Sequence, residues 1–205
     1  MNKKKGLFIS FEGPEASGKS SQILLLQKYL TTKKISFITT REPGGTKLAE
    51  SLRNLILKIK SDINIDEEIL MLMAARSHHI NNVIKPALDK GILVISDRFA
   101  DSTFVYQGYV NNFGIQKAKS LHKNILNNFL PHKTFLFNLS SSKIIARLKK
   151  RKSKNKYDKL ERNFHDQVNR GYDLISKNKR FIKIDASKSI TSINKKIINA
   201  INLLI

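Results

Sequence analysis

The chain has 205 residues, which is enough for one sizeable hydrophobic core and favours a single domain. The absence of cysteine excludes disulfides, thiolate nucleophiles and cysteine-based zinc sites. The formal net charge is +22, and 29 of the 38 basic residues are lysine. Because lysine is scattered over most helical segments, we interpret this charge as that of a lysine-rich, solvent-facing surface. The alternative is that the charge serves to bind nucleic acid.

The sequence contains no recognisable membrane or export signal. No apolar run reaches 18 residues, and the basic stretch Lys3–Lys5 precedes only a short apolar strand, without the apolar core or cleavage site of a signal peptide. Together with the lack of cysteine, these features predict a cytoplasmic protein without a membrane partner.

A phosphate-binding loop is the first functional motif along the chain. Residues 7–11 are a predicted buried strand, residues 13–20 read GPEASGKS and match G-x-x-x-x-G-K-[ST], and residues 20–30 have a helical pattern. The glycines let backbone N–H groups converge on an anion, and the dipole of the following helix reinforces them. Lys19 is placed to follow the β- and γ-phosphates, and Ser20 to ligate magnesium. The predicted ATP-binding residues are Gly13, Pro14, Glu15, Ala16, Ser17, Gly18, Lys19, Ser20 and Ser21.

Strands and helices alternate along the whole chain. The predicted strands are residues 7–11, 35–39, 92–96, 134–139 and 181–184, with helical patterns between them. This alternation predicts the α/β class, with a doubly wound five-stranded parallel sheet flanked by helices in a single domain of residues 1–205. The segment 149–156 is too basic to pack into a core, so we expect a surface loop there.

Arginine is scarce in this chain, so we expect it where a planar, bidentate donor is chemically required. Arg76 ends the apolar helical segment 69–76, one turn after Leu72 on the same face. It either reaches a buried acceptor or extends to solvent. Arg41 begins the turn-rich segment REPGGT, residues 41–46, which by itself indicates only a loop.

An acidic and a basic residue, Asp97 and Arg98, follow the predicted strand 92–96. Ligands of doubly wound sheets gather at the carboxyl ends of strands, so both side chains should face the same crevice as Lys19. Asp97 is placed to hold magnesium, directly or through water, and Arg98 to grip a second phosphate; an internal ion pair is the alternative. A polar and aromatic face suited to a base or sugar follows at helical spacing: Ser102, Thr103, Tyr106 and Gln107.

Two arginines, Arg147 and Arg151, are four residues apart, so a helix would present both to the same volume. The alternative is that they belong to a solvated, lysine-rich face. The five histidines have no metal-binding spacing and are expected to be structural or surface residues.

Taken together, these motifs resemble those of the thymidylate kinase family. GPEASGKS, REPGGT, AARSHHI, and DRF followed by STFVYQG occur in the family's order and spacing along nearly the whole chain, as does the basic segment. The resemblance implies a P-loop nucleoside monophosphate kinase-like fold with a basic lid at about residues 147–160. It implies γ-phosphoryl transfer from ATP to dTMP, giving dTDP for dTTP biosynthesis, with Mg²⁺ as cofactor, and it suggests a homodimer.

The resemblance also implies roles for single residues. Glu15 matches the position that reaches the deoxyribose 3′-hydroxyl, Arg98 the arginine that holds the acceptor phosphate, and Arg76 the arginine that reads thymine. Arg41 and Thr46 border the acceptor site without an assigned contact. The block that encloses base and sugar matches Ser102, Thr103, Tyr106 and Gln107, where the Tyr106 ring would exclude a ribose 2′-hydroxyl.

The phosphate loop contains no arginine, which resembles the bacterial type of the family, in which the lid supplies the catalytic arginine. Arg151 is the predicted catalytic residue, and Arg147 packs on adenine or assists. Such an arginine typically contributes about 10³-fold or more.

Three positions depart from the family pattern. Leu72 stands where the family usually stacks a phenylalanine on thymine, so stacking is replaced by plain apolar contact. Asn138 stands where an aspartate commonly ends the fourth strand, and Lys159 where the lid usually has an arginine.

The expected mechanism is in-line transfer driven by positioning and charge neutralisation. No general base is required, because the acceptor phosphate is already ionised. Two alternatives are a P-loop kinase of another (deoxy)nucleotide or nucleoside and a nucleic-acid-binding P-loop protein, although nucleic acid is the less favoured partner.

Overall fold

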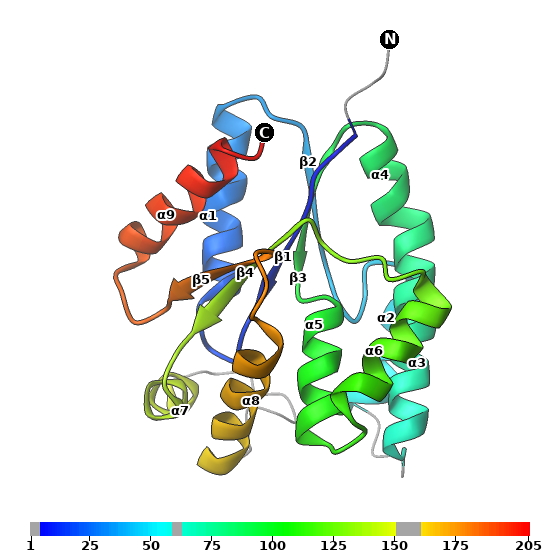
Figure 1. Ribbon diagram of the computed structural model, residues 1–205. Coiled ribbons are helices and arrows are strands. Elements are labelled where there is room, and N and C mark those ends of the chain that lie inside the picture. Colours follow the sequence, from blue (N-terminus) through cyan, green and yellow to red (C-terminus); the bar gives the residue numbers. More distant parts are fainter. Residues whose placement is uncertain (1–4, 59–62, 151–160) are drawn as a thin grey trace.

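Five parallel strands form the centre of the molecule, in the order β2-β3-β1-β4-β5 (Figure 1). The computed structural model describes residues 5–58, 63–150 and 161–205. The strands are β1 (Phe8–Glu12), β2 (Phe37–Arg41), β3 (Leu93–Asp97), β4 (Lys133–Asn138) and β5 (Phe181–Asp185). The predicted α/β fold with a five-stranded parallel sheet is therefore confirmed.

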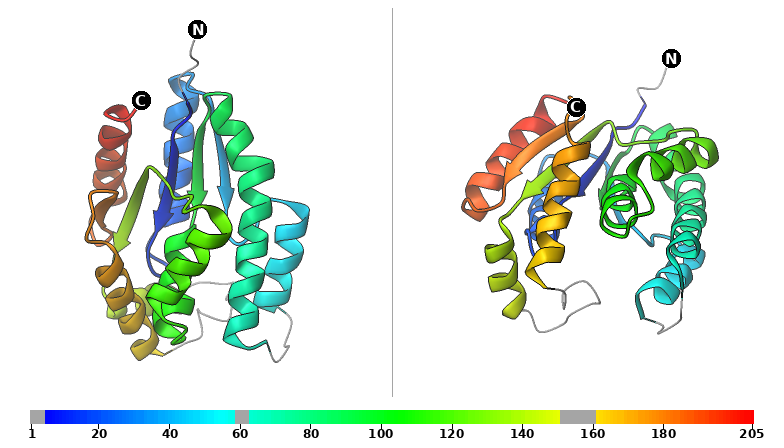
Figure 2. Two further views of the ribbon diagram at one scale, coloured as in Figure 1. Left: turned by 45° about the vertical axis from the view of Figure 1, so that its right-hand side comes forward. Right: turned by 60° about the horizontal axis from the view of Figure 1, so that its bottom comes forward.

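Helices connect the strands and cover both faces of the sheet (Figure 2). They are α1 (Lys19–Thr32), α2 (Lys47–Lys58), α3 (Ile65–His79), α4 (Lys85–Asp89), α5 (Ala100–Thr103), α6 (Ile115–Leu126), α7 (Ser141–Lys149), α8 (Arg162–Ile175) and α9 (Ile190–Asn202), with π-helical stretches η1 (Ile80–Ile84) and η2 (Phe104–Val110). In the described ranges, none of them combines the length and apolarity needed to cross a bilayer.

The central strands are apolar because helices bury them on both faces. Every residue of β1 is buried, whereas the edge strands β2 and β5 are only partly buried. The second strand occupies residues 37–41 rather than the predicted 35–39. Arg41 is consequently the last residue of β2 and not the first residue of a loop.

Two hydrophobic clusters lie on opposite faces of the sheet. In one, side chains of β1, β3, β4 and β5 pack against α1, α7 and α9; its members include Ile9, Phe11, Ile95, Phe137, Leu26 and Ile197. In the other, the alternate side chains of the same central strands pack against the helices from α3 to α6 and α8; its members include Phe8, Val94, Leu136, Met73, Val105 and Tyr172.

The phosphate loop leaves β1 at its carboxyl end and leads into α1. Gly13 has φ 131°, and a Cβ on it would collide with the backbone oxygen of Phe137 at the end of β4. Gly18 is the N-cap of α1, with φ 94° in the left-handed region. Both positions therefore require glycine, as the loop motif predicts.

The helix after β3 differs from the expected regular spacing. The chain runs as α-helix through α5 and then as π-helix through η2, where the backbone bonds i→i+5. Thr103 therefore lies on α5, and Tyr106 and Gln107 lie on η2. Such π segments are frequent at functional sites.

Candidate functional site

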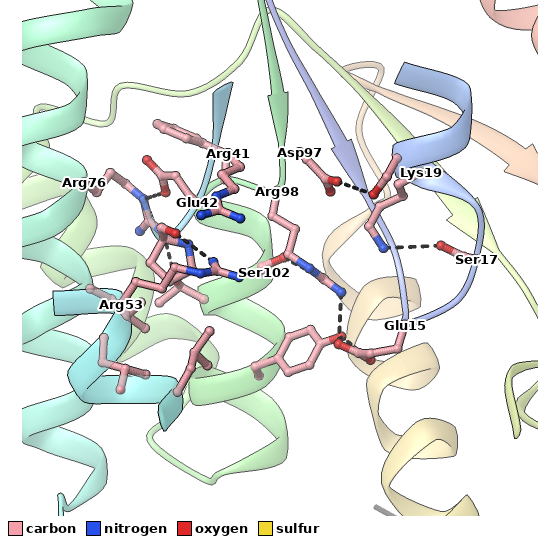
Figure 3. Close-up of a pocket in the computed structure, with 18 of the residues that line it drawn as sticks. Glu15, Ser17, Lys19, Arg41, Glu42, Arg53, Arg76, Asp97, Arg98 and Ser102 are labelled. Atoms are coloured by element: carbon pink, nitrogen blue, oxygen red, sulfur yellow. Dashed lines mark hydrogen bonds and ion pairs between the residues drawn. The ribbon is translucent and has the colours of Figure 1, made fainter. Parts of the chain in front are cut away.

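A cleft of about 490 Å³ opens at the carboxyl ends of β1, β2 and β3 (Figure 3). Its walls are the phosphate loop, the turn after β2, α2, α3, the end of β3 and the α5–η2 helix. This is the edge of a doubly wound sheet at which ligands bind. Most residues predicted for the site line it: Glu15, Ala16, Ser17, Gly18, Lys19, Ser20, Ser21, Arg41, Leu72, Arg76, Asp97, Arg98, Ser102, Thr103, Tyr106 and Gln107.

Lys19 is buried inside its own loop. Its Nζ donates to the backbone oxygens of Gly13 at 3.1 Å and Pro14 at 2.8 Å, and to Ser17 Oγ at 3.3 Å. Burial and the neighbouring Arg98 charge lower the pKa of Lys19 to about 8, against the opposing effect of nearby carboxylates. At neutral pH the loop therefore holds a mostly protonated ammonium beside its converging backbone N–H groups.

The two predicted metal ligands lie next to each other, although they come from different elements. Ser20 Oγ donates to Asp97 Oδ2 at 2.8 Å. A hydroxyl and a carboxylate beside a phosphate loop are oxygen donors of the kind Mg²⁺ takes. Within the described ranges there is no group of three or more His, Asp or Glu side chains arranged to hold a metal. An ion here would complete its coordination with phosphate oxygens and water.

Arg98 lies directly after β3 and points across the cleft toward the phosphate loop (Figure 3). Its backbone has φ 69°, which is uncommon for a residue other than glycine, and Ser96 Oγ donates to its carbonyl oxygen at 2.6 Å. Its Nη2 donates to Glu15 Oε1 at 3.0 Å, and its Nη1 to Ser102 Oγ at 3.0 Å and to the Tyr172 hydroxyl at 3.3 Å. The guanidinium is thus fixed at the cleft by three partners.

A buried carboxylate that the sequence interpretation missed, Glu12, supports this arrangement. It accepts hydrogen bonds from Phe99 N and Ser102 Oγ, both at 2.6 Å, and from the Tyr172 hydroxyl at 2.9 Å. Burial and the charge of Asp101 raise its pKa to about 7, although Arg98 and the hydrogen bonds oppose the rise. The position of an acidic residue at the end of a mostly apolar strand could have indicated Glu12 from the sequence. No sequence pattern indicates that Tyr172, on α8, contacts the site.

A second buried ion pair lies on the opposite wall. Arg76 is 2% exposed, and its Nε donates to Glu42 Oε2 at 2.6 Å while its Nη2 donates to Thr103 Oγ1 at 2.8 Å. His79 Nδ1 lies 2.9 Å from the other Glu42 oxygen. Burial raises the pKa of Glu42, but Arg76 and His79 outweigh that effect and lower it. Arg76 therefore reaches a buried acceptor rather than solvent, and this acceptor belongs to the REPGGT segment.

The same segment contains two further positions of interest. Arg41 pairs with Glu50 at 2.8 Å on α2 and is half exposed. Thr46 does not line the cleft; its Oγ1 accepts from Ala49 N at the start of α2, at 3.1 Å. Arg53, which the sequence interpretation missed, comes from α2 into the cleft and donates to the Pro43 carbonyl at 2.7 Å.

The predicted base and sugar face borders the cleft from α5 and η2. The Tyr106 hydroxyl is 2.8 Å from both carboxylate oxygens of Glu15. Gln107 Nε2 donates to Glu68 Oε1 at 2.7 Å, and Glu68 is a further cleft residue that the sequence interpretation missed. Leu72 is 6% exposed on the facing helix α3.

Of the two predicted lid arginines, only one can be placed. Arg147, on α7, donates from Nη1 to the Ala16 carbonyl at 3.1 Å and from Nη2 to the Ala186 carbonyl at 3.0 Å. It therefore joins α7 to the phosphate loop and to the turn after β5. Arg151 and most of the predicted lid lie outside the described residues.

Comparison with known proteins finds one family. The model of the thymidylate kinase family matches residues 11–197. The chain is 41% identical over 200 residues to the thymidylate kinase of Mycoplasma capricolum subsp. capricolum, covering 95% of this chain and 94% of that protein. It is 41% identical over 192 residues to that of Ruthia magnifica subsp. Calyptogena magnifica (91% and 93% covered), and 40% over 187 residues to that of Carboxydothermus hydrogenoformans (90% and 91%).

Proposed function

The chain belongs to the thymidylate kinase family and is an ATP-dependent kinase of dTMP, and we propose that its cleft holds both substrates while the γ-phosphoryl group passes between them. One observation carries this proposal: two positively charged groups, Lys19 in the phosphate loop and Arg98, line a single cleft. Arg76 and Gln107, both buried, line the same cleft. The cleft thus has two phosphate-binding ends and one wall suited to a base.

ATP would bind at the phosphate loop. The backbone N–H groups of residues 13–20 would surround its phosphates, and Lys19 would exchange its loop carbonyls for phosphate oxygens. Ser20 and Asp97 would hold Mg²⁺, which, when bound, neutralises charge on the β- and γ-phosphates.

dTMP would bind against the opposite wall. Arg98 would hold its 5′-phosphate through a bidentate contact, with Arg53 and Arg41 adding positive charge nearby. Glu15, fixed by Tyr106 and Arg98, would face the 3′-hydroxyl of the deoxyribose. Arg76 and Gln107 would face the base, while Ser102 and Thr103 would contribute through the arginines that they bond.

Transfer needs no general base. An ionised oxygen of the dTMP phosphate forms the new bond to the γ-phosphorus as the bond from that phosphorus to the β–γ bridging oxygen breaks. ADP departs with this electron pair, and dTDP is formed. The role of Lys19 and the arginines is to hold both phosphates in line and to neutralise the charge that spreads over the γ-oxygens.

The acceptor panel is the direct test. Purified protein is incubated with ATP and Mg²⁺ and with dTMP, dUMP, dCMP, AMP or thymidine, and kcat/KM is measured for each. We expect dTMP to give the highest value. A higher value for any other acceptor would reassign the substrate, and tight, salt-dependent binding of duplex DNA without kinase activity would favour the nucleic-acid alternative.

The catalytic lid arginine is assigned by two variants. Arg151→Ala should lower kcat by about 10³-fold with little change in dTMP affinity, as expected for a residue that acts on the transferred group. Arg147→Ala should have a smaller effect, because its guanidinium already bonds the Ala16 and Ala186 carbonyls. An equal loss of kcat in the Arg147 variant would move the catalytic role to α7.

We also propose an oligomeric state and a cellular compartment for the protein. Exposed apolar side chains lie on the helices α2, α3 and α6, namely Leu48, Leu55, Leu70 and Ile125, and this supports a homodimer formed through packed helices. Sedimentation velocity would test it against the 23.4 kDa of one chain. The cysteine-free composition fits a reducing compartment and supports a cytoplasmic enzyme.

A further inference from the structure

Two helices face each other across the inner end of the cleft and are joined by two buried polar contacts. On α3, Glu68, Leu72 and Arg76 follow one another at intervals of four residues, so they share one face. Arg76 bonds Thr103 at 2.8 Å and Glu68 bonds Gln107 at 2.7 Å, with Leu72 between them on α3. All five residues are buried, and all five line the cleft.

The contact between Glu68 and Gln107 determines which way the Gln107 amide points. In this contact the NH₂ group of the amide donates and the carboxylate oxygen accepts, so the NH₂ group faces Glu68. Rotating the amide by half a turn would place its carbonyl oxygen against the buried carboxylate, which is unfavourable. In the part of the chain that the structure describes, Gln107 Oε1 has no hydrogen-bond donor, so this oxygen is the end of the amide left for a ligand.

The neighbouring arginine is oriented in the same manner. Glu42 and Thr103 hold the Arg76 guanidinium in place, and a guanidinium can only donate. The inner end of the cleft therefore offers a ligand two fixed groups, an acceptor at Gln107 Oε1 and donors at Arg76.

We propose that Glu68 is a specificity-determining positioning residue, because it fixes the Gln107 amide as an acceptor and thereby selects a pyrimidine with a protonated N3. Thymine and uracil carry a donor at N3 and an acceptor at O4, which complement Gln107 Oε1 and Arg76. Cytosine carries an acceptor at N3 and a donor at N4, so both contacts would be mismatched. The inference rests on dTMP being the acceptor, as proposed above.

We expect strong discrimination of dTMP and dUMP against dCMP. A site whose buried polar groups are left unpaired by the wrong ligand rejects that ligand far more strongly than an apolar pocket rejects a missing methyl group. The 5-methyl group that distinguishes thymine from uracil lies outside the N3 and position-4 contacts. Glu68 should therefore influence dTMP and dUMP equally.

Glu68→Gln tests the proposal. A second amide can donate or accept, so it no longer forces one orientation on Gln107. We expect kcat/KM for dTMP and for dUMP to fall together by roughly tenfold, and the ratio of dTMP to dCMP to fall by at least that factor. Glu67→Gln is the matched control, because it removes the same charge from an exposed neighbour at a helix position where glutamine is equally suited to the capping box.

An exchanged pair makes the test independent of any folding defect. The double variant Glu68→Gln with Gln107→Glu keeps one amide and one carboxylate in contact and again presents an acceptor to the base. We expect it to recover most of the ratio of dTMP to dCMP that Glu68→Gln loses, and thermal melting verifies that each variant is folded.

Two results for a folded Glu68→Gln variant would overturn the proposal. One is an unchanged ratio of the kcat/KM values for dTMP and dCMP, and the other is a fall in kcat/KM for dTMP without a fall for dUMP. Failure of the proposed function is recognised separately, because the wild-type enzyme would then prefer another acceptor.

Discussion

Lys19 is held by its own loop through hydrogen bonds to two carbonyls and a hydroxyl. Those partners keep the ammonium buried, and burial is the main reason why its pKa is lowered to about 8. Phosphate oxygens of bound ATP would favour the charged form and raise that pKa again. The protonation state of one side chain is therefore linked to nucleotide binding.

This linkage predicts a pH dependence for ATP binding. Below pH 8 Lys19 is protonated in the free enzyme, and binding needs no proton. Above pH 8 it is mostly neutral when free, so binding must take up a proton, and the affinity should fall by up to about tenfold per pH unit. Calorimetric titrations between pH 7 and 9.5 should show this fall, and Lys19→Met should show a weak, flat response. A wild-type affinity that stays constant across this range would contradict the assignment.

Leu72 gives a second prediction. It is buried on the cleft wall between Glu68 and Arg76, where a bound base would lie. Leu72→Phe should tighten dTMP binding by up to roughly tenfold, because an aromatic ring stacks on a base where leucine only packs. Binding titrations would measure the change, with Leu24→Phe on the exposed face of α1 as control. Unchanged or weaker binding would mean that the base does not lie over this position.

The charged groups that the motifs name were predictable from the sequence, but their partners were not. Asp97 and Ser20 could be placed together because Asp97 ends β3, and Ser20 lies in the first turn of the helix that follows the phosphate loop after β1, at the same edge of the parallel sheet. Glu12, Glu42 and Glu68 could not, because each acts through a buried contact to a residue far away in the chain. Sequence patterns predict which face of an element is apolar, but they do not predict which distant residue a buried carboxylate contacts.

At the level of elements, the Tyr172 hydroxyl connects α8 to polar residues at the cleft. Tyr172, near the end of this helix, contacts Glu12 on β1 and both Arg98 and Ser102 after β3. The helix also packs closely along η2, where a Cβ on Gly171 would lie 2.9 Å from Val105. The position of Arg98 therefore depends on a helix that is remote in sequence.

Tyr172→Phe tests this connection. Removing the hydroxyl should lower the free energy of unfolding by about 1 kcal/mol and raise the KM for dTMP several-fold, because Arg98 loses one of its three partners. Tyr29→Phe is the matched control, since its hydroxyl bonds Asn202 far from the cleft. Equal KM values for the two variants would show that Tyr172 has only a structural role.

Strands were the elements that the sequence predicted best. The central strands are buried on both faces, so they appear as continuous apolar runs that end at polar residues. The π-helical stretch η2 was not predicted, because π-helix is rare and the apolar and aromatic pattern of this segment does not distinguish i→i+5 from i→i+4 bonding.

For the whole molecule, a net charge of +22 must be carried on one small surface. Self-repulsion of this charge opposes folding, and salt screens it. Raising NaCl from about 20 mM to about 300 mM should increase the melting temperature by roughly 3–5 °C. Scanning calorimetry would measure this, with KCl at the same ionic strength as a control for ion identity. A melting temperature that does not rise would show that the charges are already balanced locally.

The groups assigned to the phosphates and those assigned to the base occupy different kinds of position. Asp97 and Arg98 lie at the end of β3, and Lys19 begins α1 directly after the phosphate loop that leaves β1; hydrogen bonding between β1 and β3 fixes the places of these two strands. Of the groups assigned to the base, Gln107 lies on η2, whereas Leu72 and Arg76, together with Glu68, lie on α3, a helix in the connection between β2 and β3. Substitutions on this connection can alter which base is accepted without moving the reacting phosphates. Evolution can therefore adapt such a scaffold to a new nucleotide by changing one helix face while it inherits the phosphoryl-transfer chemistry intact.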